Sequence, residues 1–246
     1  MSALRVGGFL FYSFEVNTLY FEKGICLTVL LPIAEMIKSH NMTSTIPAVR
    51  RGPKPNPGTK QNLISAGMSM LHRMGYSATG IKDIVEEAGV PKGSFYNHFD
   101  SKESFAEEIV NNYFEQALPQ LKRQLEDPDL PPLERLKVYF NTRKESFIES
   151  GFSQGCLLGN FSLEVADHSE RIRLRIAFHL STWTQLIEEC IAEGQESGEI
   201  RTTLSAALLA GFVLNSWEGA LVRMRAEKND AALNEFMEVV FKTVLV

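Results

Sequence analysis

Residues 76 to 102 read YSATGIKDIVEEAGVPKGSFYNHFDSK and predict two short helices joined by a glycine turn. Thr79 comes just before an apolar run with helical spacing, where its hydroxyl could cap the first free amides. Gly89 follows that run, and glycine tolerates the positive φ that closes a helix and turns the chain. Pro91 lacks the N–H that the first turn of the next helix would leave unpaired. The stretch therefore predicts a helix-turn-helix.

The second of these helices, over residues 91 to 97, carries side chains that suit nucleic acid. Lys92 offers a cation to a phosphate or a guanine edge, and Gly93 lets the backbone approach DNA. Hydrogen-bonding side chains continue along the segment at Ser94, Tyr96, Asn97, His98 and Lys102. A polar turn between two packing helices is the alternative, but it does not explain why cap, turn glycine, proline and donors occur together. Phe95 and Phe99 are predicted to face the core.

The run AGVPKGSFYNHFDSKE, residues 88 to 103, resembles the signature of the TetR family of one-component transcriptional repressors. The resemblance implies a three-helix DNA-binding domain followed by a larger all-α domain that dimerises and usually holds an effector pocket. It also implies a homodimer on a palindromic double-stranded operator, released by a small-molecule or electrophile effector. The residues it places against the operator are Thr79, Lys92, Gly93, Ser94, Tyr96, Asn97, His98 and Lys102. Asn97 stands where family members usually have an aromatic or basic residue.

Charge is distributed unevenly along the 246 residues, although the net charge is −5. Residues 50 to 102 hold eight basic and four acidic residues, whereas residues 103 to 246 carry a net charge of −9. Net positive charge is thus confined to the segment with the helix-turn-helix, as a module that binds phosphates requires. The overall negative charge argues against an indiscriminate nucleic-acid binder.

The three cysteines, Cys26, Cys156 and Cys190, lack CxxC or Cys/His spacing. They indicate neither a disulfide framework nor a zinc site, and they fit a reducing cytoplasm. The sequence has no Gly-rich phosphate loop and no recognisable Ser/His/Asp motif. We therefore expect no metal, no cofactor and no enzymatic activity.

Residues 1 to 41 differ in composition from the rest, being apolar without helical periodicity. Their longest apolar run, residues 24 to 34, is about half of the roughly 20 residues that a membrane span needs. A signal peptide would need a basic start and a cleavage site, so a start codon assigned too early is favoured, with Met36 or Met42 as the true initiator. We expect a leader outside the domains and no membrane association.

Residues 42 to 58 form a basic arm in which four prolines exclude helix and ladder structure. It carries Arg50, Arg51 and Lys54 just before the predicted DNA-binding domain. The arm is either a solvated linker or a segment that reaches a neighbouring minor groove or phosphates.

The remaining chain is predicted to be all-α, with a helix-turn-helix domain over residues 59 to 104 and a ligand-binding and dimerisation domain over 105 to 246. Thr59 is expected to cap the first helix, and Asp100 with Glu103 to form a capping box that opens a helix ending near Leu125. Further helical periodicity covers residues 131 to 150, 154 to 166, 169 to 197, 203 to 226 and 229 to 245. Strand alternation is absent from these segments.

The segment GCLLGNFSLEVAD, residues 155 to 167, is similar to a TetR subgroup that controls N-ethylmaleimide reductase, in which a cysteine here senses electrophiles. At the start of a helix, Cys156 would be favoured as a thiolate; the alternative is a buried small hydrophobic residue. Cys190 has no activating cation in view and is expected to be inert.

Large or polar residues on the central helices could build an effector pocket, although aromatic residues at helical spacing more often form core. The candidates are Phe161, Arg175, Phe178, His179, Trp183, Asn215 and Trp217. By analogy with the family, the dimer interface is expected at Leu208, Leu209, Phe212, Val213, Trp217, Leu221, Phe236, Val240 and Val244. The rival functions are a DNA-binding module without ligand response and an enzyme that uses the C-terminal pocket.

Overall fold

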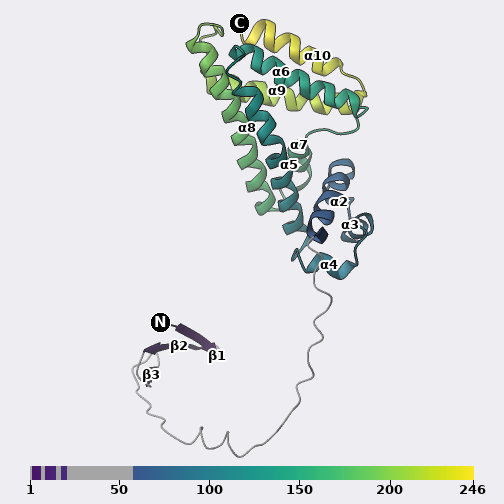
Figure 1. The fold of residues 1–246 in the computed structure, drawn as a ribbon, viewed down its shortest axis with the longest axis vertical. Coiled ribbons are helices and arrows are strands. Elements are labelled where there is room, and N and C mark those ends of the chain that lie inside the picture. Colours follow the sequence, from purple (N-terminus) through teal and green to yellow (C-terminus); the bar gives the residue numbers. More distant parts are fainter. Residues whose placement is uncertain (1, 7–8, 15–17, 21–57) are drawn as a thin grey trace, which may run out of the picture. The chain divides into compact units, whose positions relative to one another are not determined.

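The computed structural model describes residues 2 to 6, 9 to 14, 18 to 20 and 58 to 246, drawn as ribbon in Figure 1. The chain divides into two units, residues 1 to 53 and 54 to 246. Met36, Met42, Arg50, Arg51 and Lys54 lie outside the described residues.

The first unit contains a three-stranded antiparallel sheet in the order β1-β2-β3. The strands are β1 (Ser2–Val6), β2 (Phe9–Phe14) and β3 (Thr18–Tyr20). Val6 pairs with Phe9 across the first turn, and Phe14 pairs with Thr18 across the second. These strands were not predicted from the sequence. The aromatic residues of FLFYSF favour extended backbone, which gives a physical reason for these strands.

Within residues 58 to 246 every regular element is helical, so the predicted all-α class is confirmed for this unit. The helices are α2 (Gly58–Met74), α3 (Ile81–Glu87), α4 (Lys92–Tyr96), α5 (Lys102–Leu125), α6 (Pro132–Glu149), α7 (Leu157–Val165), α8 (Glu170–Glu196), α9 (Ala206–Glu227) and α10 (Ala231–Val239), followed by the π-helical turn η1 (Val240–Val244). These bounds lie within a few residues of the periodic segments, because apolar spacing and Pro or Gly breakers mark helix ends in the sequence itself.

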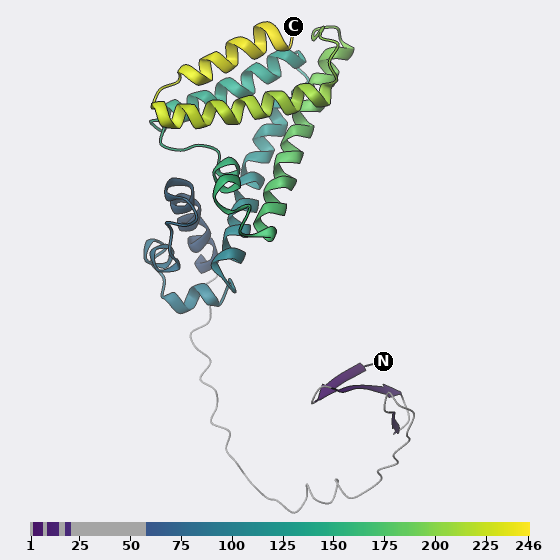
Figure 2. The same ribbon diagram turned by 180° about the vertical axis from the view of Figure 1, so that it is seen from behind.

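Two long helices, α5 and α8, run side by side through this unit and connect its two ends (Figures 1 and 2). The helices α2, α3 and α4 pack at one end of α5, and α6, α9 and α10 form a layer at the other end. The short α7 packs on α8 and α5 between the two ends.

The core beneath the helix-turn-helix is closed by Phe95 and Phe99, which the sequence predicts to face it, together with Phe105. Phe95 and Phe105 are fully buried with ring centroids 5.2 Å apart, and Phe99 lies 4.8 Å from Phe105. Gly67 of α2 makes room for this cluster, because a Cβ there would lie 2.2 Å from the tip of the Phe105 ring. The core prediction is confirmed.

The turn between α3 and α4 also has the predicted geometry, since Gly89 has φ +65°. The cap expected before α3 is wrong. Gly80 is the N-cap, its N–H donates to the Asp83 carboxylate at 2.9 Å, and the Thr79 hydroxyl instead donates back to the carbonyl of Gly75 at 2.7 Å. Thr79 therefore stabilises the preceding turn.

Two other expected caps are also wrong. Thr59 does not precede α2, because the helix begins at Gly58 and Thr59 is buried in its first turn. Ser101, and not Asp100, is the N-cap of α5, where its side chain accepts the N–H of Ser104 at 3.1 Å. This serine cap satisfies the amide of Ser104, one residue further along than the Glu103 amide that the predicted capping box would have satisfied.

Candidate DNA interface and effector cavity

The exposed face of α4 and the residue after it carry most of the predicted DNA contacts. Lys92, Gly93, Tyr96 and Asn97 are exposed, whereas Ser94 and His98 are half-buried. A Cβ on Gly93 would meet nothing within 4 Å, so the backbone of α4 is open to an approaching surface there. The solvent side of this segment therefore presents the Lys92 cation, hydrogen-bonding side chains and the open backbone at Gly93. Phe95 and Phe99 lie on the opposite side, in the core.

Two residues assigned to the same interface are engaged inside the protein. The Thr79 side chain is fully buried, so it is not available to DNA in this structure. Lys102 donates to the carbonyl of Tyr76 at 2.5 Å, and its ammonium lies 4.2 Å from the centre of the Tyr76 ring. Burial lowers the pKa of Lys102. These contacts hold the turn before α3 against α5, and they leave α4 as the main candidate DNA surface.

The residues proposed from sequence for an effector pocket do not come together in one place. Trp217 is fully buried and packs against Phe140 and Phe236, with ring centroids 5.1 Å from each. Phe161 is fully buried beside Tyr76. Both rings are core, as the alternative interpretation of the sequence had it.

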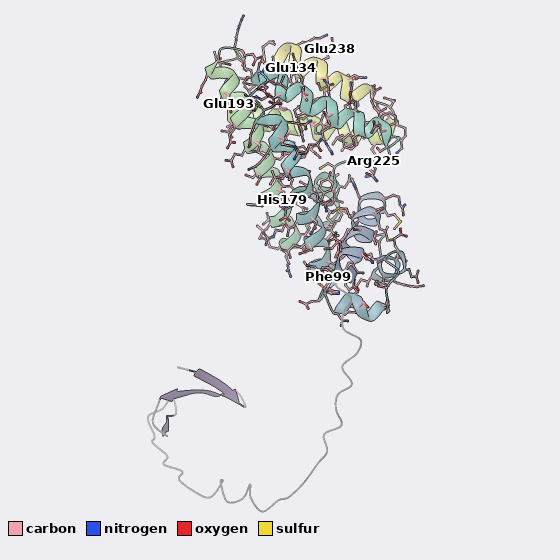
Figure 3. All side chains as sticks on the ribbon, viewed as in Figure 1. Phe99, Glu134, His179, Glu193, Arg225 and Glu238 are labelled. Atoms are coloured by element: carbon pink, nitrogen blue, oxygen red, sulfur yellow. The ribbon has the colours of Figure 1, made fainter. Side chains whose placement is uncertain are left out.

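Four other pocket candidates lie along α8, which carries His179 as labelled in Figure 3. His179 contacts the amide oxygen of Asn111 at 2.9 Å, and Arg175 pairs with Glu107 at 3.0 Å. Phe178 is exposed to solvent. Trp183 borders a small cavity of about 40 Å³ between α5, α6 and α8. An aromatic pocket that unites these residues with Phe161 and Trp217 is therefore not formed.

A larger cavity of about 590 Å³ lies between α7, α8 and α9. Its apolar wall includes Leu163, Leu180, Leu214, Leu221 and Val222. Its polar groups are Cys156, Asn160, Ser162, Thr184, Asn215, Glu218 and Arg225. Figure 3 labels Arg225 near the C-terminal end of α9. A mostly apolar wall with a few polar groups, at this volume, is typical of small-molecule sites.

Of the residues selected from sequence, Cys156 and Asn215 line this cavity. The sequence analysis missed Asn160, Glu218 and Arg225. Glu218 carried a usable signal, since it is the only acidic residue between Ala206 and Ala226, in the middle of a mostly apolar helix. A lone carboxylate in such a run indicates a polar site inside the fold.

Cys156 is the N-cap of α7 and is buried against the cavity, only 4% exposed. Burial raises the pKa of its thiol well above the ordinary value, and the nearby Glu218 carboxyl raises it further. The thiolate expected from the helix N-terminus is therefore not favoured in this structure. Burial likewise raises the pKa of Glu218 to about 7, against opposing effects of Cys156 and Arg143. Desolvation outweighs the helix dipole at this site.

Cys190 differs from Cys156 in its surroundings. Its thiol donates to the carbonyl of Pro132 at 3.4 Å, and burial raises its pKa to about 12. It is not among the residues that line the 590 Å³ cavity.

The region of α7 contacts the helix-turn-helix domain at both of its ends. At the N-terminal end, the His72 ring at the end of α2 lies 2.5 Å from the carbonyl of Gly155 through Nε2. At the C-terminal end, the Glu164 carboxylate accepts the backbone N–H groups of Tyr76 at 2.8 Å and Ser77 at 2.6 Å. Burial would raise the pKa of Glu164, but these hydrogen bonds outweigh it and lower the pKa. The wall of the cavity and the turn before α3 are thus joined through one nine-residue helix.

Among the described residues, no group of His, Cys, Asp or Glu side chains is arranged to hold a metal ion. In the same part of the chain, no helix has the length and apolar character that crossing a membrane requires.

A helix-turn-helix joined to a larger helical domain, with a cavity between α7, α8 and α9, is the architecture of a DNA-binding transcription regulator. Residues 63 to 109 match the family of bacterial regulatory proteins of the tetR type, and residues 132 to 240 match the tetracyclin repressor-like C-terminal domain. The chain belongs to the TetR family of DNA-binding transcription regulators.

Known relatives agree with this assignment. The HTH-type transcriptional repressor DhaR of Mycobacterium sp. strain GP1 is 40% identical over 186 residues, which cover 76% of this chain and 92% of DhaR. The repressor NemR of Escherichia coli K12 is 27% identical over 139 residues, covering 56% of this chain and 70% of NemR. A crystal structure of a regulatory protein TetR from Rhodobacter sphaeroides superposes with a TM-score of 0.72 at 31% identity, covering 75% of this chain and 98% of that one.

Proposed function

We propose that this regulator is a homodimeric repressor that leaves a palindromic operator when an effector occupies the cavity between α7, α8 and α9. The observation that carries the proposal is the position of α7, which lines a 590 Å³ cavity and contacts the turn before α3 through Glu164. An occupant that displaces α7 would shift the population toward a dimer whose two α4 helices no longer match successive major grooves. Operator binding implies a cytoplasmic location.

The DNA-binding part of the proposal assigns the operator contacts to α4. Lys92, Gly93, Tyr96 and Asn97 would meet bases or phosphates directly, with Ser94 and His98 at the edge of the contact. Arg50, Arg51 and Lys54 would add phosphate contacts from the preceding arm. The domains would divide near residue 104, with DNA binding over 59 to 104 and effector binding and dimerisation over 105 to 246.

A gel-shift titration with single alanine variants tests the interface. Lys92→Ala and Tyr96→Ala should each weaken operator binding by about 1–3 kcal/mol without changing the thermal midpoint, because both side chains are exposed and outside the core. Lys122→Ala, an exposed cation near the far end of α5, is the matched control. Unchanged affinity in both α4 variants would remove this helix from the DNA interface.

The dimer part of the proposal rests on exposed apolar side chains of α9 and α10. Leu208, Phe212 and Val239 are 58%, 48% and 51% exposed. Several residues expected from sequence at the interface are instead buried in the core of the chain itself: Leu209, Val213, Trp217, Leu221, Phe236 and Val240. In the dimer, a second copy of the chain would cover Leu208, Phe212 and Val239.

The effector part assigns a small, mostly apolar molecule or a reactive electrophile to the cavity. Two observations support this assignment. The chain is similar in sequence to the repressor NemR, and Cys156 borders the cavity. Modification of Cys156, or occupancy of the cavity, would release DNA. Loss of operator binding on exposure to N-ethylmaleimide, abolished in Cys156→Ser, would support this assignment. A regulator without ligand response would keep its operator under all such conditions, and an enzyme would turn the added molecule over.

A further inference from the structure

A carboxyl group lies beside the Cys156 thiol within the effector cavity. Both Cys156 and Glu218 line the cavity, one from the start of α7 and the other from α9. A Cβ built on Gly159 would lie 2.4 Å from Glu218 Oε2 and 3.8 Å from Cys156 Cβ. The thiol and the carboxyl therefore border the same small volume above Gly159, and the missing side chain of Gly159 leaves the room in which the carboxyl sits.

Glu218 is not committed to another partner among the described residues. Its Oε1 atom is buried without a hydrogen-bond partner, and no ion pair in that part of the chain includes Glu218. A buried acceptor without a donor is costly, so such a group commonly has a role beyond packing. The Cys156 thiol lies near enough to this carboxyl that each side chain shifts the pKa of the other.

Several titratable groups surround this pair from the neighbouring helices. Arg143 and Tyr139 face it from α6, Tyr113 from α5, His72 from α2 and Arg225 from α9. Burial lowers the pKa of His72 and raises the pKa values of both tyrosines, so these groups are uncharged near neutral pH. Arg143 lowers the pKa of Glu218, but less than burial raises it. Glu218 is thus the group near Cys156 whose charge changes around neutral pH.

We infer that Glu218 is the proton acceptor through which Cys156 reacts with an uncharged electrophile of the activated-alkene class inside this cavity. The inference rests on the proposed function in one respect, namely that the cavity admits the effector. Leu163, Leu180 and Val222 line the space in which such a molecule would lie, and they favour an uncharged reactant over an ion.

The reaction balances with the two side chains and the alkene alone. The Cys156 thiol gives its proton to the Glu218 carboxylate, and the sulfur electron pair forms a bond to the β-carbon of the alkene. The π electrons move to the activating carbonyl oxygen and form an enolate. The protonated Glu218 then returns the proton to the α-carbon, so the net change is addition of S–H across the double bond, with no oxidant or reductant.

A proton acceptor is needed because the thiol alone supplies little thiolate. Burial and Glu218 both hold the thiol pKa well above its ordinary value, so spontaneous ionisation near neutral pH is rare. The Glu218 carboxyl, with a pKa of about 7, is ionised in a growing fraction of molecules as the pH rises through neutrality. General-base catalysis by a group with a pKa near the working pH typically contributes about 10²–10⁴-fold in rate.

The experiment follows alkylation of full-length protein by N-ethylmaleimide from pH 5 to pH 9. Mass spectrometry of the peptides after brief exposure gives separate rates for Cys156 and Cys190. In the wild type, the Cys156 rate should rise with pH and bend near 7, where Glu218 ionises. In Glu218→Gln the bend should disappear, and the rate at pH 8 should fall by about 10²-fold or more.

Faster alkylation of Cys156 in Glu218→Gln than in the wild type would overturn the inference. If Glu218 only raises the thiol pKa, then removing its charge lowers that pKa, and Glu218→Gln should react faster than the wild type. An unchanged rate and pH profile would equally contradict a proton-acceptor role. Glu218→Asp, which keeps a carboxylate, should restore part of the rate and of the bend.

A second variant keeps both reacting side chains. Gly159→Ala places a Cβ where Glu218 Oε2 lies, so it should displace the carboxyl and slow Cys156 in the same direction as Glu218→Gln. Wild-type kinetics in Gly159→Ala would count against the inference. An unchanged Cys190 rate in every variant shows that the fold is intact.

Operator release is measured separately by gel shift on the alkylated protein. If Cys156 shows the predicted dependence on Glu218 but DNA stays bound, then the sensing function is wrong while the proton-acceptor role stands. If DNA is released but the alkylation rates do not depend on Glu218, the sensing function stands and the proton-acceptor role is wrong.

Discussion

Glu218 should make the stability of the folded chain depend on pH. Burial raises its pKa from 4.5 to about 7, so the folded state holds a proton that the unfolded state has already released between these pH values. By linkage, the free energy of unfolding falls as pH rises from 4.5 to 7, and the full cost persists above that range. Since one pKa unit corresponds to 1.36 kcal/mol, the shift from 4.5 to about 7 costs at most ~3.4 kcal/mol at pH 8.

Glu218→Gln removes this cost and should therefore be more stable than the wild type at pH 8, with a much smaller difference at pH 5. Urea unfolding of both proteins at the two pH values measures the gap. Glu149→Gln, a change at an exposed carboxyl on α6, serves as control and should show no such gap. Equal gaps at pH 5 and pH 8 would mean that Glu218 does not titrate with a raised pKa.

At the scale of the helix, Gly67 in α2 permits the packing of the DNA-binding domain. Gly67→Ala should lower the free energy of unfolding by about 1–3 kcal/mol, because its Cβ would lie 2.2 Å from the buried Phe105 ring, which Phe95 and Phe99 hold in place. Gly93→Ala is the matched control, since nothing lies within 4 Å of a Cβ there. Thermal unfolding compares the two, and equal midpoints would show that the ring cluster adjusts freely.

Helix positions were predictable from sequence, whereas helix caps were not. Apolar spacing and the breakers Gly89 and Pro91 fixed α3 and α4, because they act locally on the backbone. The predicted cap at Thr79 rests on its residue type and on its place just before the apolar run. Its hydroxyl has two possible partners, and only the folded geometry shows that it bonds back to Gly75.

The effector cavity lay beyond sequence reasoning for a related reason. Cys156 was found because its neighbours resemble a known segment, but the volume it borders exists only where α7, α8 and α9 fail to fill the space between them. Trp217 and Phe161 were plausible pocket residues by type, yet they fill the core. Residue type indicates what can line a site, and packing decides which residues do.

At the scale of the whole molecule, dimerisation should depend on the exposed apolar face of α9. Phe212→Glu places a charge at a side chain that is 48% exposed in the single chain, so the chain should still fold. In a dimer that covers this face, the buried charge would be unpaired and should weaken association by several kcal/mol. Light scattering after size exclusion measures the oligomer. Leu174→Glu, at an exposed apolar residue of α8, is the control, and a dimeric Phe212→Glu protein would place the interface elsewhere.

Communication between the cavity and the operator should pass through Glu164. Its carboxylate holds the amides of Tyr76 and Ser77, so it joins the cavity wall on α7 to the turn before α3. Glu164→Gln weakens both charge-assisted hydrogen bonds but leaves α4 and the cavity in place. We expect this variant to bind the operator, and to show a smaller ratio between affinities before and after alkylation of Cys156. Gel shifts on both forms measure that ratio, with Glu149→Gln as a carboxyl control outside the junction.

Because a ligand shifts a two-state equilibrium only by its difference in affinity for the two states, loss of the connecting contact must reduce the response. A full response in Glu164→Gln would show that the signal reaches the DNA-binding helices by another route, such as the packing of α5 against α8.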